Sequence, residues 1–438
     1  MTAARRSSKL ACMIESELKT RILDAVDDGF AEQTGFIAEL VKFPSLRGAE
    51  HTAQDFMASA MRQRGLAVDH WQVDIEAIRH LPGFSPVAVS YDNAFNVVGA
   101  HRPANVKGKS LILNGHIDVV PVGPLDMWST PPFEPKVDGN WLHGRGGGDM
   151  KAGLAVNLYA LDALRRAGLA PAAPVYLQSV VEEECTGNGA LACLARGYRA
   201  DAALITEPSE NRLGTAQVGV IWFQVKVRGI PVHVSHAGTG ANAIEAAYEI
   251  MQALHRLEDR WNDAEHRHAA FARHHHPINL NVGKIAGGDW ASSVPAWCTF
   301  DVRVSIFPGQ DIGQAKAEIE ACVREAAASN RFLANNPPAI VYNGFEAEGY
   351  VLRNAEAPRA VLESAHHAAC GGALEPLVFT GTTDARFFGL YADIPGLVYG
   401  PRAESIHGFD ERVDLDSTRR TTQAVALFIA EWCGLDPV

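Results

Sequence analysis

Apolar positions along the first two hundred residues follow two alternating patterns, one typical of helices and one of short strands. Residues 15–43 carry an imperfect apolar stripe at helical spacing, and Gly29 and Gly35 are positions where this helix could break. The pattern predicts further helices at residues 51–64 and 152–167, and buried strands at residues 109–115, 174–181 and 202–206. Apolar strands that alternate with helices predict an α/β layer with a largely parallel sheet.

The pattern changes near residue 217. Residues 220–227 alternate strictly, with an apolar side chain at every second position and Gln224 and Lys226 on the other face. Burial on one side only is typical of an antiparallel sheet with a solvated face. The elements predicted next are a helix at residues 241–257, strands at 278–285 and 297–306, and a helix at 312–328. This β-α-β-β-α-β order resembles a ferredoxin-like module.

The α/β pattern then resumes, with a helix near residues 354–369, a strand at 375–379 and a closing helix at 416–433. A small α+β module inserted into a larger α/β domain is the simplest interpretation. We therefore predict one domain from residues 1–216 and 336–438, with a mixed, largely parallel sheet. A second, inserted domain covers residues 217–335.

Composition restricts the partners of this chain. Its 438 residues are 47% hydrophobic and 21% charged, as in ordinary globular proteins with large cores. The formal net charge of -12 argues against a nucleic-acid or anionic-membrane partner, because either would require a basic surface. An anionic substrate remains compatible with this charge, since bound divalent cations can reverse the local field.

Cysteine usage and the N-terminus predict a cytoplasmic protein. The seven cysteines are scattered, odd in number and without a CxxC pair, which favours reduced thiols, Cys12 among them. After Arg5, Arg6 and Lys9, the apolar run Leu10–Ile14 is too short for the core of a signal peptide. No run approaches the roughly 18 apolar residues of a membrane span.

Five segments offer side chains that bind metals, and most follow an apolar strand or lie in a glycine-rich turn. The candidate residues are His116 with Asp118, Asp149 in Gly144-Arg-Gly-Gly-Gly-Asp149, Glu182 to Glu184, Glu207 and His407. His116 and Asp118 lie two apart in an extended segment, so Asp118 could accept the imidazole N–H and fix its tautomer. Each segment also has a structural explanation: a simple hydrogen bond for His116, a helix N-cap for Asp149, and a solvated acidic loop for the glutamates.

The glycine-rich turn fits neither phosphate-binding pattern. The spacing of a Walker motif is absent, and Asp149 stands where a dinucleotide-binding motif requires its third glycine. In contrast, the three glutamates follow the apolar residues 175–181, and ligand sites of α/β proteins lie at the carboxyl ends of such strands. Consecutive carboxylates at that edge are costly unless cations balance them.

In their order and context, these segments resemble a family of dinuclear-zinc hydrolases. The family includes acetylornithine deacetylase, succinyl-diaminopimelate desuccinylase, aminoacylase and carboxypeptidase G, and the resemblance extends over residues 35–432. It implies two Zn²⁺ ions, with Co²⁺ or Mn²⁺ as substitutes. Asp149 would bridge the two ions, one of which would also bind His116 and Glu207, and the other Glu184 and His407. Such mixed imidazole and carboxylate ligands suit zinc.

The same resemblance implies the catalytic roles. Glu183 would be the general base that takes a proton from water and returns it to the leaving amine, with Glu182 as a flanking acid. Asp118 would orient His116.

The inserted domain would serve as a lid and dimerisation domain, so a homodimer is expected. Its His233 would reach a neighbouring active site and stabilise the oxyanion, and His236 matches the family position less well. Arg303 would bind the substrate carboxylate.

Two departures from the family bear on the substrate. Ser292 stands near a position where many relatives carry asparagine, and residues 380–384 replace a glycine-richer loop. A further group of histidines in the inserted domain lacks the ordered carboxylate partners found in the five segments and is expected to be an exposed loop. These histidines are His266, His268, His274, His275 and His276.

The leading hypothesis is therefore a metal-dependent amidohydrolase that acts on a small N-acyl amino acid or a related amide, as deacetylases and desuccinylases do. A dipeptidase or carboxypeptidase could use the same ions and base with a different pocket. A non-catalytic metal-binding assembly protein is disfavoured, because the inferred base Glu183 accompanies every inferred ligand.

Overall fold

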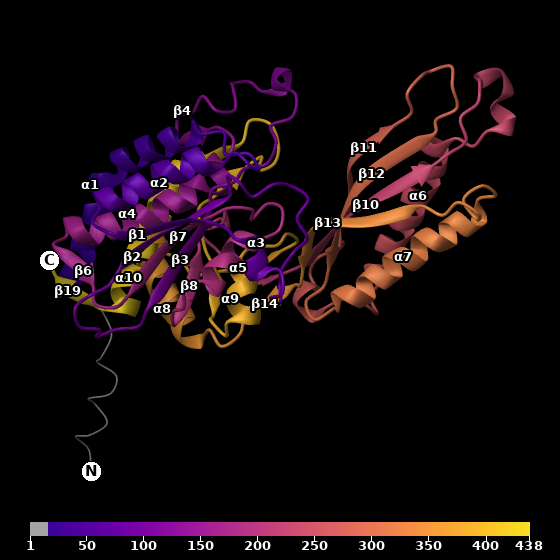
Figure 1. Ribbon diagram of the computed structural model, residues 1–438. Coiled ribbons are helices and arrows are strands. Elements are labelled where there is room, and N and C mark those ends of the chain that lie inside the picture. Colours follow the sequence, from indigo (N-terminus) through magenta and orange to yellow (C-terminus); the bar gives the residue numbers. More distant parts are fainter. Residues whose placement is uncertain (1–15) are drawn as a thin grey trace, which may run out of the picture.

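The computed structural model describes residues 16–438, and Figure 1 shows a large unit beside a smaller, elongated one. The basic N-terminal segment with Leu10–Ile14, and Cys12, lie outside the described residues. Six cysteines within residues 16–438 are free thiols. Across these residues, helices that combine the length and the hydropathy needed to cross a bilayer are absent.

The large unit is built on a nine-stranded mixed sheet. Its strands are β1 (Ala67–Gln72), β2 (Phe95–His101), β3 (Leu111–His116), β7 (Val175–Val180), β8 (Ala202–Ile205), β9 (Leu213–Gln217), β14 (Tyr350–Val351), β15 (Pro376–Phe379) and β16 (Gly396–Val398). The order is β1-β2-β7-β3-β8-β16-β9-β14, with β15 also paired to β9. The central strands β7, β3, β8 and β16 are parallel, and β1, β2 and β14 pair antiparallel to their neighbours, which confirms the predicted mixed, largely parallel sheet.

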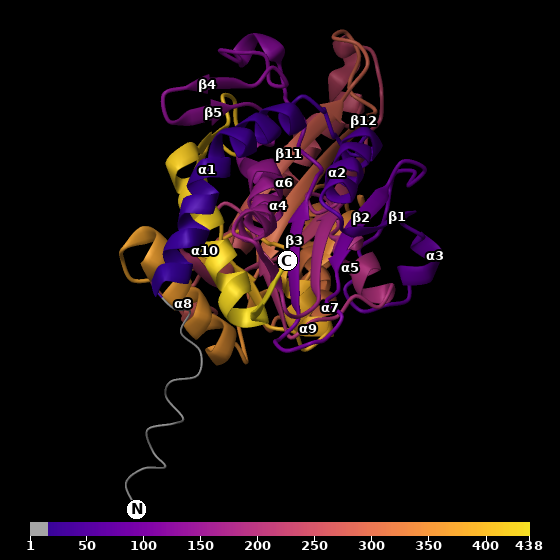
Figure 2. The ribbon, with the colours of Figure 1, turned by 90° about the vertical axis from the view of Figure 1, so that its left-hand side faces the viewer.

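Helices cover this sheet on both sides. They are α1 (Ser16–Val41), α2 (His51–Gln63), α3 (Ile75–Ile78), α4 (Ala152–Arg166), α5 (Asn188–Ala195), α8 (Glu356–Cys370), α9 (Ala385–Tyr391) and α10 (Leu415–Cys433). Figure 2 shows α1, α10 and α8 on one side of the strands and α5 on the other. Helix α1 is continuous through Gly29 and Gly35, because its buried face packs along α4 and α10 over its whole length.

The small unit is an antiparallel sheet with two helices on one face. Its elements in chain order are β10 (Gly219–Arg228), α6 (Ala243–Trp261), β11 (Leu280–Gly287), β12 (Trp297–Ile306), α7 (Ile312–Ser329) and β13 (Ala339–Ala347). The spatial order is β11-β12-β10-β13, the arrangement of a ferredoxin-like fold. The predicted alternation in β10 is confirmed, since Phe223 and Val225 are fully buried in the core shared with both helices.

The sequence pattern missed the edge of the large sheet. No element was predicted at residues 67–101, yet they contain β1 and β2. Strand β1 pairs on one side only, and its residues are half-buried or exposed, so its composition lacks the apolar run of a central strand.

Short strands outside the large sheet join distant parts of the chain. The strands are β4 (Lys136–Asp138), β5 (Trp141–His143), β17 (Ala403–Glu404) and β18 (Arg412–Asp414), in the order β17-β18-β5-β4, together with β6 (Leu169–Pro171) and β19 (Leu435–Pro437), which pair with each other. Because β18 pairs with β5, the loop of residues 405–411 lies beside the glycine-rich turn of residues 144–149.

Candidate metal centre

Three parallel strands deliver candidate ligands to one edge of the large sheet. His116 is the last residue of β3, the three glutamates follow β7, and Glu207 lies two residues past β8. Strands β3 and β7 pair in register with His116 opposite Val180, so both strands end at the same level of the sheet. The carboxyl ends of parallel strands are where α/β proteins bind ligands. Asp149 joins them from the turn before α4, and His407 from the loop between β17 and β18.

The two oxygens of the Asp149 carboxylate face two different histidines. Its Oδ1 lies 3.1 Å from Nε2 of His116, and its Oδ2 lies 3.4 Å from Nε2 of His407. The His407 Nε2 is also 3.1 Å from the Glu184 carboxylate, and the His116 Nε2 is 3.7 Å from Oε1 of Glu207. Such an arrangement of donor atoms suits a carboxylate that bridges two cations.

Glu183 completes this group, with its Oε2 4.0 Å from Nε2 of His116. We refer to the six residues as the donor cluster: His116, Asp149, Glu183, Glu184, Glu207 and His407. Two overlapping sets within it, His116 with Asp149 and Glu184, and His116 with Glu183 and Glu207, have donor atoms within 4.8 Å of one another. The donor cluster is thus a candidate metal-binding group.

Asp118 connects the histidine and the acidic loop. The Nδ1 of His116 is 2.9 Å from the main-chain oxygen of Asp118 and 3.5 Å from its Oδ1, so the main-chain oxygen is the nearer partner. The Asp118 carboxylate accepts the backbone N–H groups of Glu183 at 3.3 Å and Glu184 at 3.0 Å. Asp118 therefore orients both the ring and the loop, as the outer partners of metal ligands commonly do.

Carboxylates outnumber imidazoles in the donor cluster. It has four carboxylates and two imidazoles, and His116, Glu183 and Glu207 are at most 7% exposed. Burial raises the pKa values of Glu183 and Glu207 well above the usual range, and neighbouring carboxylates add to the effect. Buried carboxylates in excess are costly unless cations balance them, and oxygen with imidazole donors suits Zn²⁺ and related divalent ions.

Glu182 turns away from the donor cluster, although it adjoins the other glutamates. Arg47 donates Nε and Nη2 to its two carboxylate oxygens at 2.5 and 2.7 Å, and the Tyr91 hydroxyl donates to the same carboxylate at 2.7 Å. Glu182 is 1% exposed and adopts a positive φ of 67°. The acidic loop is therefore buried and not solvated. Sequence reasoning missed Arg47 and Tyr91, because each is far from Glu182 along the chain.

The glycine-rich turn brings Asp149 close to its partners. Helix α4 begins at Ala152, and the residue at its N-cap position is Lys151. Asp149 is therefore not a helix N-cap, which was the structural alternative to a metal ligand at this position. Gly146 has φ 76°, a conformation that favours glycine. A Cβ at Gly148 would lie 2.6 Å from the Cβ of Ala403, so this position accepts only glycine without a shift of its neighbour.

Asp384 is a further carboxylate near the donor cluster, in the loop of residues 380–384. It is 2% exposed, and burial raises its pKa to about 7. Its charge contributes to the raised pKa of Glu183. The sequence marked this loop only as a departure from related proteins.

The small unit holds the remaining predicted residues. The Nδ1 of His233 is 2.7 Å from the Ser235 hydroxyl, and His233 forms a bridge with Ser293. The main-chain oxygen of Ser292 accepts the N–H of Val234 at 3.1 Å. Within residues 16–438, no hydrogen bond or ion pair joins His233 to the donor cluster. A single chain thus assembles the five predicted ligands and Glu183, and leaves His233 apart.

Arg303 links the two units. From β12 it donates Nη1 to the Ser305 hydroxyl at 2.5 Å and to the oxygen of Asn279 at 3.3 Å, and Nη2 to the oxygen of Thr380 in the large unit at 3.3 Å. No carboxylate of residues 16–438 forms an ion pair with it. Burial lowers its pKa to about 10, so the guanidinium remains charged at neutral pH without an anionic partner.

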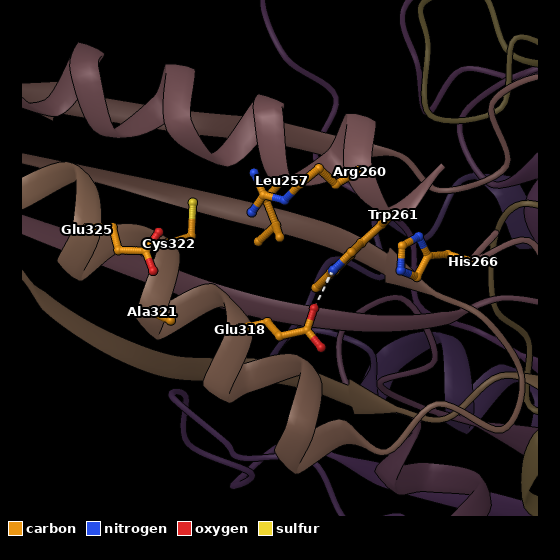
Figure 3. Close-up of a pocket in the computed structure, with 8 residues that line it drawn as sticks. All are labelled: Leu257, Arg260, Trp261, His266, Glu318, Ala321, Cys322 and Glu325. Carbon is orange, nitrogen blue, oxygen red and sulfur yellow. Dashed lines mark hydrogen bonds between the residues drawn. The ribbon is translucent and has the colours of Figure 1, made fainter. Parts of the chain in front are cut away.

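A shallow cavity of about 270 Å³ lies between α6 and α7, on the small unit (Figure 3). In it, Nε1 of Trp261 donates to Oε2 of Glu318 at 2.7 Å. None of the predicted site residues lines this cavity, so it is separate from the donor cluster.

The fold and the donor cluster are those expected of a metal-dependent hydrolase of the α/β class. The chain belongs to the peptidase family M20/M25/M40, whose family model matches residues 112–431. Its family and relatives identify it as a hydrolase of amide bonds, as the sequence predicted.

Two curated relatives illustrate the range of activities. The chain is 28% identical to the N-formyl-4-amino-5-aminomethyl-2-methylpyrimidine deformylase of Halalkalibacterium halodurans, over 97% of this chain and 99% of the relative. It is also 28% identical to the succinyl-diaminopimelate desuccinylase of Stenotrophomonas maltophilia, over 86% of this chain and 93% of the relative.

Solved structures share the fold at low sequence identity. A di-peptidase from Saccharomyces cerevisiae superposes with a TM-score of 0.79 at 15% identity, covering 96% of this chain and 99% of that structure. Human carnosine dipeptidase 1 gives a TM-score of 0.77 at 13% identity, covering 95% of this chain and 99% of that structure. Both likenesses establish the fold and leave the substrate open.

Proposed function

We propose that this protein hydrolyses the amide bond of a small N-acyl amino acid, using two divalent cations, Zn²⁺ foremost and Co²⁺ or Mn²⁺ as substitutes. When bound, these cations supply Lewis acidity that polarises the amide carbonyl and acidifies water. His116 and Glu207 would hold one ion and Glu184 and His407 the other, with Asp149 shared. The observation that carries this assignment is the Asp149 carboxylate, whose two oxygens face two different imidazoles.

Glu183 is the proposed general base. Within residues 16–438 no hydrogen bond engages its carboxylate, which leaves the oxygens free to take a proton from water and return it to the leaving amine. Asp118 supports this role, because its carboxylate accepts the N–H groups of Glu183 and Glu184 and so limits the freedom of the loop.

The choice of an amino-acid-like substrate rests on Arg303. A buried guanidinium without an anionic partner is unfavourable, and a substrate carboxylate would supply that partner in a bidentate geometry. Ser292 is a second candidate for substrate contact, on the loop opposite His233.

A second candidate substrate is an N-formyl aminomethylpyrimidine. It is favoured by two relatives of that activity, which match 97% and 87% of this chain at 28% and 29% identity. A formyl amide presents the same scissile bond, while the pyrimidine lacks the carboxylate that Arg303 would bind. Dipeptide cleavage would use the same donors and base.

We also propose that the small unit, which consists of residues 217–335 together with β13, acts as a lid and dimerisation domain, and that a homodimer brings His233 to a neighbouring donor cluster. The exposed position of His233, apart from the cluster of its own chain, supports this arrangement. The free thiols of residues 16–438 support a reducing compartment, and we propose the cytoplasm.

A substrate panel tests the proposal. The Zn²⁺- or Co²⁺-loaded protein is assayed with N-acetyl, N-succinyl and N-formyl amino acids, an N-formyl aminomethylpyrimidine and dipeptides, with Glu183→Gln as the inactive control. We expect the highest kcat/KM with an N-acyl amino acid and a large loss when its carboxylate is amidated. Preference for the pyrimidine, unaffected by Arg303→Met, would favour the second candidate. Full metal loading with no turnover of any amide would refute an enzymatic function.

A further inference from the structure

A buried ion pair outside the donor cluster joins two distant segments. Arg145 lies in the glycine-rich turn and Glu411 lies four residues after His407, and both are 1% exposed. The Arg145 Nη1 donates to Oε2 of Glu411 at 2.6 Å. Buried ion pairs of this kind often add little to stability, because desolvation of both charges offsets their attraction. Their geometry is therefore a better guide to their role than their presence.

Glu411 holds the segment that ends in Asp149. Its Oε1 accepts the backbone N–H groups of Gly148 at 3.0 Å and of Asp149 at 3.1 Å. Its main-chain oxygen accepts the N–H of Gly144 at 2.9 Å. One residue thus binds both ends of the glycine-rich turn, and the close approach at Gly148 leaves the turn little room to move.

Arg145 holds the segment that carries His407. Its Nη2 donates to the main-chain oxygen of Gly408 at 2.9 Å, and its guanidinium lies over the Trp128 ring, 5.1 Å from the centroid. Trp128 in turn packs edge-on against Phe409 at 6.0 Å. His407 has a φ of 61°, which a residue with a side chain seldom adopts unless its surroundings hold it there.

We propose that Arg145 and Glu411 are positioning residues that set Asp149 and His407 at the spacing required by a shared cation. The inference rests on the proposed ligand set. Each member of the pair bonds the segment of its partner: Glu411 fixes the backbone at Asp149, and Arg145 fixes the backbone beside His407. Neither side chain touches substrate or the reacting atoms in this role.

Metal binding to chelator-treated protein tests this inference directly. In Glu411→Gln, the amide oxygen can still accept from the turn, but the amide NH₂ faces Arg145 and the bond between them is lost. We expect affinity for at least one Zn²⁺ or Co²⁺ ion, measured by calorimetry, to fall by ~10–100-fold. The Co²⁺ absorption spectrum should change as well, since it reports ligand geometry.

Asp162→Asn is the matched control. Asp162 pairs with Arg64 at 2.6 Å in the same large unit, away from the donor cluster, so its loss should leave metal affinity unchanged. Glu411→Asp is the second variant, which keeps the charge but withdraws the carboxylate from the turn, and it should also weaken binding.

Wild-type stoichiometry, affinity and Co²⁺ spectrum in folded Glu411→Gln or Glu411→Asp would overturn the proposal. So would the unfolding of both variants, because the pair would then serve the fold and not the site. The measurement needs no substrate. A failure of the proposed amidohydrolase activity would therefore appear separately, as absent turnover with normal metal binding in the wild type.

Discussion

Within residues 16–438, each unit has one cluster in which histidine and glutamate side chains meet. In the small unit, Glu258 accepts from His255 at 2.9 Å, from His276 at 3.0 Å and from the N–H of Leu280 at 2.8 Å. There one carboxylate has two imidazoles and a backbone donor. In the large unit, the donor cluster sets four carboxylates against two imidazoles.

The pKa shift of Glu258 has the opposite direction to those of Glu183 and Glu207. Burial raises the pKa of Glu258, but the hydrogen bonds from His255 and His276 outweigh it, and the net pKa is lowered. Burial raises the pKa values of Glu183 and Glu207, and their neighbours leave them raised. Within residues 16–438, both groups of donors that fit a metal ion lie in the large unit. Both clusters contain histidine and glutamate, so the residue types do not separate a candidate metal site from a structural cluster. What separates them is the ratio of carboxylates to the groups that donate hydrogen bonds to them.

Metal removal should have the largest effect on activity. It should change the donor cluster and leave the cluster around Glu258 unchanged. We expect exhaustive chelation to abolish turnover, and added Zn²⁺ or Co²⁺ to restore it. A bound ion at about 1,000 times its Kd stabilises the fold by about 4 kcal/mol, so calorimetry should show a lower Tm without metal. Glu258→Gln, as control, should respond to the chelator as the wild type does. Full turnover in protein shown to be metal-free would contradict the assignment.

Glu183→Gln should have the next largest effect on activity. Replacement of the general base is expected to lower kcat by ~10²–10⁴-fold, because the amide cannot take the proton of water. Metal content, measured by elemental analysis, should remain that of the wild type, since the proposed ligands are intact. Undiminished turnover would remove Glu183 from its role.

His233→Ala tests whether the small unit contributes to catalysis. Loss of an oxyanion donor should lower kcat by ~10²–10³-fold and leave the metal content unchanged. His236→Ala is a matched control in the same loop, and we expect it to retain near-normal kcat. A loss of bound zinc in the His233 variant would show that its role was wrongly assigned.

Glu258→Gln should have the smallest effect of these changes. It should lower the stability of the small unit and leave kcat unchanged. Loss of charge-assisted hydrogen bonds is expected to destabilise the small unit by ~1–2 kcal/mol near neutral pH. Because the folded-state pKa of Glu258 is lowered, its stabilisation is complete above the pKa of an unfolded glutamate and is lost as the pH falls through the folded value. The Tm difference between variant and wild type should therefore persist at about pH 5 and shrink as the pH falls below about 4. A constant difference would argue against the lowered pKa.

Local sequence determined much of the secondary structure and the identity of the candidate ligands. The helices and central strands were predictable because their apolar periodicity is strong, as in β12, whose predicted and observed bounds coincide. His116, the three glutamates and Glu207 could be found because each follows an apolar strand, and strand ends share an edge of the sheet. The exposed edge strand β1 lacked that signal.

Only the tertiary structure decided which side chains meet. Three adjacent glutamates are equivalent in sequence, but Arg47 and Tyr91 turn Glu182 away and leave Glu183 and Glu184 facing the cluster. The same holds for Arg145 and Glu411, whose contact joins segments far apart along the chain. Apolar periodicity indicates which face of a segment is buried and which is exposed. The hydrogen-bond partner of a side chain depends instead on how distant segments pack against each other. For this reason the chemistry could be predicted from sequence, and its geometry could not.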